Sequence, residues 1–178
     1  MRSAIVPVLI LVFLGACGPY AHKASPAAAE PAAGFVLASE DFRNNDTMPR
    51  MFACTGQNIS PDLRWSGAPP GTKSFILTMK DLDAPGGDFL HWAVVDIPAT
   101  ANGAGRNAKF PPNSREFQND AGGFGYTGPC PPSGTHRYIF SLYAVDTERL
   151  NDAPAPLEEF IKDHTLAKAV LTGVYRKQ

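Results

Sequence analysis

The 178-residue sequence has no basic run and no excess of charge of either sign, its formal net charge being −1 at pH 7. It therefore offers no electrostatic basis for binding nucleic acid or for membrane attachment through clustered basic residues. It has no Cys-x-x-Cys pair, and its 4 histidines are scattered, which disfavours a zinc site. Ser133 stands outside any Gly-x-Ser-x-Gly elbow, which disfavours a serine hydrolase. What is present is an apolar fraction of 44%, enough for one domain with a sizeable core.

The N-terminus is predicted to be an export signal over residues 1–17. Arg2 supplies positive charge, and residues 4–14 form an apolar run that is too short to span a bilayer. The Leu-Gly-Ala-Cys sequence that ends at Cys17 resembles the lipobox of bacterial lipoproteins, which implies that Cys17 is acylated and anchors the protein to a membrane. A plain secretory signal cleaved nearby is the alternative. Gly18 stands where an aspartate would resemble the inner-membrane retention signal. We therefore expect the outer membrane of a bacterial envelope, with the domain facing the periplasm or the cell exterior.

Residues 18–34 are rich in alanine and proline and have almost no large apolar side chain. This composition is typical of a disordered tether. The folded domain is therefore expected over residues 35–178.

The sequence contains 3 cysteines, and a lipid on Cys17 would leave one pair, Cys54 and Cys130. Because an exported protein meets an oxidising compartment, we predict a disulfide between these two residues. Two free thiols and a zinc site are the alternatives.

Short apolar or alternating segments separated by proline-rich turns predict a protein made mainly of β-strands. Strands are expected near residues 35–38, 63–65, 73–80, 89–97, 138–145 and 169–175. One helix is expected over residues 156–168. Its shared face would hold Leu157, Phe160, Ile161, His164 and Ala167, with His164 toward the core. Residues 99–122 have few apolar anchors and are expected to form a mobile surface excursion. This pattern predicts an antiparallel β-sandwich with one late helix.

The stretch 123–146 joins a glycine- and proline-rich loop to a predicted strand. Gly123, Gly125 and Gly128 match Gly-x-Gly-x-x-Gly, but they follow polar residues and run into Pro-Cys-Pro-Pro. We therefore reject a dinucleotide-binding fingerprint, which has to follow a strand and open a helix. His136 and Arg137 stand where the loop becomes a strand, a common location for functional sites. We expect Arg137 to pair with a buried carboxylate rather than with a ligand.

Polar residues at three predicted strand ends suggest a binding pocket. They are Asp81 with Asp83, then His91, then His136 with Tyr138. A protonated imidazole donates hydrogen bonds, carries positive charge and holds its proton better beside a carboxylate. We therefore expect an anion pocket in which the carboxylates stand behind the histidines, since a carboxylate facing the anion would repel it. Taken singly, the aspartates could instead cap a turn, and His91 could be a core histidine.

Two long motifs in this order resemble the phosphatidylethanolamine-binding proteins, also called Raf kinase inhibitor proteins, in their bacterial and archaeal branch. The resemblance covers nearly all of residues 35–178. Its carriers are Asn58-Ile59-Ser60-Pro61, Asp81-x-Asp83-Ala84-Pro85, His91-Trp92, Ile97-Pro98, Gly125-Tyr126-x-Gly128-Pro129-x-Pro131-Pro132 and Gly134-Thr135-His136-Arg137-Tyr138-x-Phe140.

The resemblance implies an antiparallel β-sandwich with a small surface pocket for phosphate-like anions such as phosphorylated head groups. Carried over by motif position, the pocket residues are Asp81, Asp83, Pro85, His91, Pro131, His136 and Tyr138. Leu82 replaces the proline that is usual in the first motif, so we expect a less rigid turn there. Only residues 86–90 separate Pro85 from His91, so we expect a more open pocket than in eukaryotic members.

We predict a non-enzymatic protein, without cofactor or metal, that binds a small anionic ligand or a phosphorylated or acidic group on a partner. Inhibition of an envelope protease or another enzyme through the loops at the pocket rim is the alternative. A weak hydrolase with His91 or His136 as general base is a third reading, disfavoured because no nucleophile or metal constellation is evident. The sequence leaves open whether the protein forms a homodimer. Relatives in the family include dimers, but this sequence has no exposed apolar stripe that would require one.

Overall fold

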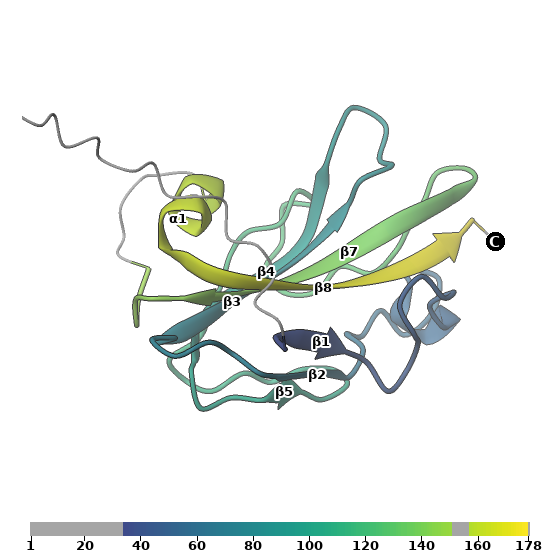
Figure 1. Ribbon diagram of the computed structural model, residues 1–178. Coiled ribbons are helices and arrows are strands. Elements are labelled where there is room, and N and C mark those ends of the chain that lie inside the picture. The colour runs from purple at the N-terminus through teal and green to yellow at the C-terminus, as the bar shows by residue number, and fades with distance from the viewer. Residues whose placement is uncertain (1–33, 151–156, 178) are drawn as a thin grey trace, which may run out of the picture.

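The computed structural model describes residues 34–150 and 157–177 (Figure 1). The predicted export signal, its Cys17 and all but the last residue of the predicted tether lie outside these ranges. Within them, no helix has both the length and the apolar character needed to cross a membrane.

Two antiparallel sheets form a sandwich, as predicted. The larger sheet consists of β3 (Ser74–Asp81), β4 (Phe89–Pro98), β6 (Arg115–Glu116), β7 (Thr135–Val145) and β8 (Thr165–Arg176), in the order β6-β4-β3-β7-β8. The smaller sheet consists of β1 (Val36–Ala38), β2 (Leu63–Ser66) and β5 (Gly103–Ala104), in the order β1-β2-β5. A 3-10 turn, η1 (Arg50–Phe52), and one helix, α1 (Leu157–His164), complete the described elements.

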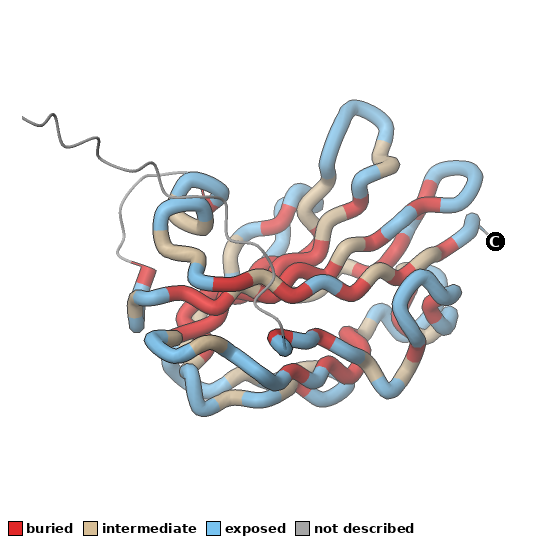
Figure 2. Tube along the Cα trace, in the orientation of Figure 1, coloured by how far each residue is buried: buried red, intermediate tan, exposed pale blue. Residues whose placement is uncertain are grey.

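The core lies between the two sheets because side chains alternate across each strand. On β8, Ala167, Ala169 and Leu171 are buried, whereas Val170 between them is exposed. Figure 2 shows buried residues running along the facing strands, with exposed residues at the turns. The central strands β3 and β4 are buried at nearly every position, because a second apolar cluster that includes Leu157 of α1 covers the outer face of the large sheet.

Residues 44–48 cover part of the outer edge of β8. Thr47 forms a parallel bridge with Val174, and the backbone of Met48 donates to the Val174 carbonyl at 2.8 Å. The Val174 N–H donates in turn to the Asp46 carbonyl at 2.9 Å. The backbone groups of Val174 that β7 does not use are therefore satisfied within the chain.

The helix is shorter than predicted, and this part of the prediction was wrong. It ends at His164, and β8 begins directly at Thr165. Ala167 faces the core as part of β8. Buried and exposed side chains alternate along β8 from this residue onward, and the strand pairs with β7 over its whole length. His164, which was predicted to point toward the core, does not do so. Its side chain is 39% exposed, and its Nδ1 lies 2.8 Å from a carboxylate oxygen of Asp146.

Two other boundaries differ from the prediction. β7 begins at Thr135, three residues earlier than predicted, so His136 and Arg137 are its second and third residues. The excursion over residues 99–122 contains the short strands β5 and β6, and it has a buried residue, Asn119, near its end. Two-residue strands leave no period in the sequence, which is why the pattern did not reveal them.

Candidate functional site

A cavity of about 400 Å³ opens where β3 ends and where β4 and β7 begin. Its floor comes from the large sheet, and its roof comes from residues 119–132, which we call the roof loop. The lining residues are Asp81, Ala84, Pro85, Phe89, His91, Ala121, Thr127, Cys130, Pro132 and His136. Most of these side chains are apolar, as in typical small-ligand sites, and the polar groups are few and convergent.

The register of β3 and β7 brings Asp81 and His136 together. Asp81 lies opposite Tyr138, and His136 is two residues before Tyr138 on the same face. The Nδ1–H of His136 donates to Oδ2 of Asp81 at 2.7 Å, and both side chains are buried. Oδ1 of Asp81 accepts the backbone N–H of Asp83 at 2.8 Å. Asp81 therefore fixes the ring of His136 and leaves Nε2 as the ring nitrogen that a ligand could use.

His91 enters the cavity from a β-bulge. The pairing of β3 with β4 passes from Trp92 to Leu90 and skips His91, which re-aims its side chain. Its Nδ1–H donates to the Thr127 carbonyl at 2.8 Å, and the Thr127 N–H donates back to the His91 carbonyl at 3.1 Å. Here too Nε2 is left available. Burial lowers the pKa of His91, and the Thr127 carbonyl and the Asp81 carboxylate oppose this only in part.

Tyr138 stands behind the histidines and does not line the cavity. Its side chain is fully buried, and its ring packs at nearly a right angle to that of His91, with 5.2 Å between the centroids. Burial, followed by the charge of Asp81, raises the pKa of the Tyr138 hydroxyl, which therefore stays protonated. Within residues 34–150 and 157–177 this hydroxyl has no hydrogen-bond partner. A buried hydroxyl without a partner is uncommon in folded proteins.

Asp83 and Pro131 lie outside the cavity. Asp83 turns to the surface, where it accepts the Nη2–H of Arg137 at 2.8 Å and the Nε–H at 2.9 Å. This ion pair lowers the pKa of Asp83 to about 2. Arg137 thus pairs with a carboxylate as predicted, but the Asp83 side chain is 30% exposed rather than buried. Pro131 lines a neighbouring cavity.

The structure therefore brings together four of the seven residues predicted to bind ligand. They are Asp81, Pro85, His91 and His136. The role of all seven in ligand binding stays a prediction.

Asn119, which the sequence analysis missed, organises the roof loop. It is 4% exposed, and its Nδ2 donates to the Gly125 carbonyl and to the Thr127 hydroxyl, each at 3.0 Å. Its Oδ1 accepts the backbone N–H groups of Ala121 and Gly123, each at 3.1 Å. Asn119 thus holds in place the residue that anchors His91. In the sequence it is one polar residue among many in a polar stretch, so no pattern singles it out.

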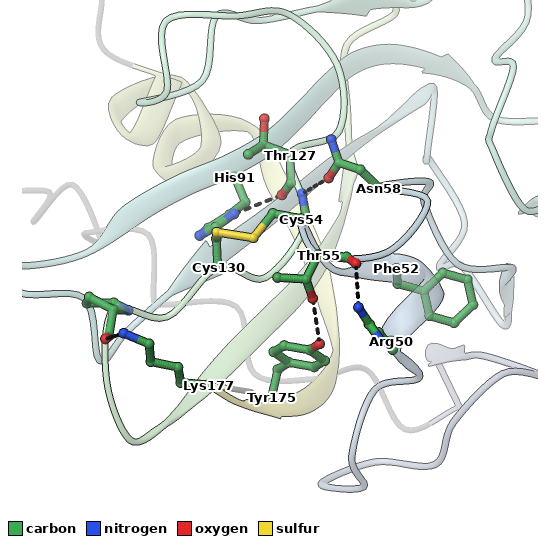
Figure 3. The surroundings of a disulfide bond; sticks show 12 residues. Arg50, Phe52, Cys54, Thr55, Asn58, His91, Thr127, Cys130, Tyr175 and Lys177 are labelled. Atoms are coloured by element: carbon green, nitrogen blue, oxygen red, sulfur yellow. Dashed lines mark hydrogen bonds between the residues drawn. A yellow bond between two sulfur atoms is a disulfide. The ribbon is translucent and has the colours of Figure 1, made fainter.

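The predicted disulfide is confirmed and fastens the roof loop to the segment after η1 (Figure 3). Cys54 and Cys130 are joined with 5.5 Å between their Cα atoms. Oδ1 of Asn58 accepts the Gly128 N–H at 2.8 Å beside the bond. A Cβ on Gly128 would lie 2.1 Å from the Phe52 carbonyl oxygen, so only glycine fits at this crossing.

The charge of the cavity depends on its histidines. No lysine or arginine is among its lining residues, and Asp81 is the one carboxylate there. Within the described ranges, no group of three histidine, cysteine or acidic side chains is placed to hold a metal ion. The arrangement is suited to hydrogen bonding through two imidazoles, whose protonation sets the sign of the charge.

Three comparisons identify the family. A sequence profile described as Phosphatidylethanolamine-binding protein matches residues 38–176. A UPF0098 protein of Methanothermobacter thermautotrophicus is 40% identical over 148 residues, which cover 79% of this chain and 98% of that protein. LppC of Mycobacterium tuberculosis, whose name describes it as a candidate lipoprotein, is 37% identical over 159 residues, covering 79% of this chain and 77% of LppC. The solved structure of Escherichia coli YbcL, described as a new member of the mammalian PEBP family, matches with a TM-score of 0.75 at 34% identity, over 81% of this chain and 99% of YbcL. The chain therefore belongs to the phosphatidylethanolamine-binding protein family.

Proposed function

We propose that the protein binds, without catalysing a reaction, a small phosphate-like anion, either free or carried on a head group or partner. One observation carries this proposal. His91 and His136 are both anchored through Nδ1, which leaves the Nε2 atoms of both rings available at one cavity. Two protonated imidazoles would donate charge-assisted hydrogen bonds to the oxygens of a phosphate group.

The charge of the cavity sets a condition on binding. When both rings are neutral, both Nε2 atoms are acceptors, and the Asp81 carboxylate gives the cavity a negative charge. Such a cavity repels an anion. Binding therefore requires a proton, taken up by His91 or His136 or brought by the ligand.

Titration of the purified protein with phosphate, phosphoethanolamine and a neutral analogue tests this proposal. The NMR ring signals of His91 and His136 should move together for the two anions and stay still for the neutral analogue. His136→Ala should abolish the response. His164→Ala is the matched control, because it removes a histidine that lies outside the cavity. Ring signals of His91 and His136 that do not shift at millimolar phosphate would contradict the proposal.

The absence of catalysis is part of the proposal. Among the lining residues, the one hydroxyl belongs to Thr127 and is held by Asn119, and the sulfur of Cys130 is in a disulfide. Neither is poised as a nucleophile. The Asp81–His136 pair nevertheless has the geometry of a general base. A phosphodiesterase assay decides between a binding protein and a hydrolase, since turnover that disappears in His136→Ala would establish an enzyme.

We also propose that Cys17 carries a lipid that anchors the protein in a bacterial envelope, with the outer membrane favoured by Gly18. The Leu-Gly-Ala-Cys sequence and the similarity to LppC, described as a candidate lipoprotein, support this. Growth with labelled palmitate tests it. The wild-type protein should take up label and fractionate with membranes, and Cys17→Ser should not. An unlabelled wild-type protein in the soluble fraction would rule the anchor out.

Inhibition of an envelope protease or another enzyme is the second candidate function. Phe124 in the roof loop is 70% exposed, and Leu82 in the turn after β3 is 41% exposed. Apolar side chains that project from loops suit insertion into the cleft of another protein. Inhibition of an envelope protease that Phe124→Ser loses, while the phosphate response is kept, would favour this function. A wild-type protein that inhibits none of the proteases tested would remove it.

A further inference from the structure

A second cavity lies on the opposite side of the Cys54–Cys130 bond from His91. Its volume is about 270 Å³. Figure 3 shows His91 on one side of the bond and Thr55, Tyr175 and Lys177 on the other. Its lining residues are Cys54, Thr55, Pro129, Cys130, Pro131, Pro132, Tyr175 and Lys177. Cys130 and Pro132 line both cavities and thus form a wall between them.

The walls of the second cavity are apolar and poor in hydrogen-bond donors. Its three prolines, Pro129, Pro131 and Pro132, have no backbone N–H to offer, and the disulfide sulfurs donate none. The remaining polar side-chain groups are the hydroxyls of Thr55 and Tyr175, 3.3 Å apart, and the ammonium of Lys177.

Lys177 supplies the one formal charge among the lining residues. Its Nζ donates to the Pro132 carbonyl at 2.6 Å, and its backbone N–H donates to the Gly134 carbonyl at 2.9 Å. These bonds hold the end of the chain against the loop before β7. An ammonium has three N–H groups, so two remain for a ligand. In the part of the chain that the structure describes, no carboxylate forms an ion pair with Lys177.

We propose that this cavity is a second ligand site, distinct from the anion pocket, for a small monocarboxylate with an apolar body. The carboxylate accepts hydrogen bonds from Nζ of Lys177 and from the hydroxyl of Thr55 or Tyr175. The apolar body lies against the prolines and the disulfide. One ammonium matches the single charge of a carboxylate, whereas a phosphate dianion would leave oxygens without donors in these walls. A water molecule takes about 30 Å³ of the liquid, so the cavity has the volume of roughly nine waters and has room for a molecule of butyrate size.

Titration of the purified protein with sodium butyrate tests the proposal. We expect saturable NMR shifts at Thr55 and Tyr175, with a dissociation constant in roughly the millimolar range for so small a ligand. The ring signal of His91 should not move. Butyramide, which has the same shape and no charge, should bind about tenfold more weakly, as expected for loss of a charge-assisted hydrogen bond.

Two variants separate the role of Lys177 from a general effect of charge. Lys177→Gln should weaken butyrate binding about tenfold. Arg176→Gln removes a neighbouring positive charge that lines neither cavity and should change binding by less than about twofold, because exposed charges are screened. The ratio of butyrate to butyramide affinity in the wild-type protein is an independent measure that needs no variant. Equal affinity for the two ligands, or no saturable shift at Thr55 and Tyr175, would overturn the proposal.

Discussion

The affinity of the anion pocket should rise as the pH falls. Burial lowers the pKa of His91, so its ring is neutral at pH 7 in the free protein, and its Nε2 is an acceptor rather than a donor. A bound anion needs a donor there, so the ring has to take up a proton from solution when an anion without a proton binds. Sulfate is the sharpest probe, because its charge stays constant over the range of about pH 5 to 8 in which histidine titrates. Any change of sulfate affinity with pH then comes from protonation of the protein and not of the ligand.

The size of the effect follows from the number of protons taken up. One proton per anion changes the dissociation constant about tenfold per pH unit, which equals about 1.4 kcal/mol. We therefore expect the dissociation constant to fall about tenfold per unit as the pH falls from about 8 toward 6.5, the ordinary pKa of histidine, with levelling below the pKa of His91 in the free protein.

Calorimetric titration in two buffers of different ionisation enthalpy counts these protons directly. His91→Asn should remove about one proton from the count, whereas His164→Asn should remove none.

The free energy of unfolding should also depend on the protonation of His91. Because the folded ring of His91 resists protonation, the unfolded chain binds more protons below about pH 6.5, and the free energy of unfolding falls as the pH drops through that value. Sulfate should offset part of this loss. A sulfate affinity that stays flat from about pH 8 to 6 would refute the reasoning.

Four further predictions concern the frame of the site. Asn119→Ala should lower the free energy of unfolding in urea by roughly 2 kcal/mol and weaken phosphate binding, because it removes the hydrogen bonds by which the buried Asn119 side chain holds the roof loop; unchanged stability would contradict this. Gly128→Ala should cost about 3 kcal/mol in the same assay, since its methyl group would meet the Phe52 carbonyl at 2.1 Å. Cys130→Ser should cost about 4 kcal/mol, because the lost bond spans a sequence separation of 76, yet phosphate affinity should change little, since backbone and side-chain hydrogen bonds still position the roof loop. Asp83→Asn should remove the part of the acid-induced loss of stability that falls between about pH 4 and 2, because the lowered pKa of Asp83 adds stability that is present above pH 4 and lost toward pH 2.

The sandwich and the centre of the site were predictable because both leave local marks in the sequence. Alternation and proline-rich turns located the long strands, and the spacing of Asp81, His91 and His136 placed polar groups at three strand ends. The cysteine count yielded the disulfide. None of these inferences needs three-dimensional information.

The remaining features depend on tertiary register. The bulge that aims His91 into the cavity, and the turn that carries Asp83 out to Arg137, follow from how β3 meets its neighbours. The end of α1 at His164 was missed because alanine favours helices, so Ala167 extended the predicted helix, and pairing with β7 overrides that preference. Asn119 matters through five partners that lie close only after the roof loop folds.

The cover that residues 44–48 place over β8 also bears on self-association. An outer strand with free backbone groups is a template onto which another chain can add, and this is how many β-proteins aggregate or swap strands. At Val174 those groups already bond to Asp46 and Met48, so a second copy cannot extend the sheet there without displacing them. Variants that loosen this short segment are therefore expected to precipitate before they lose their fold.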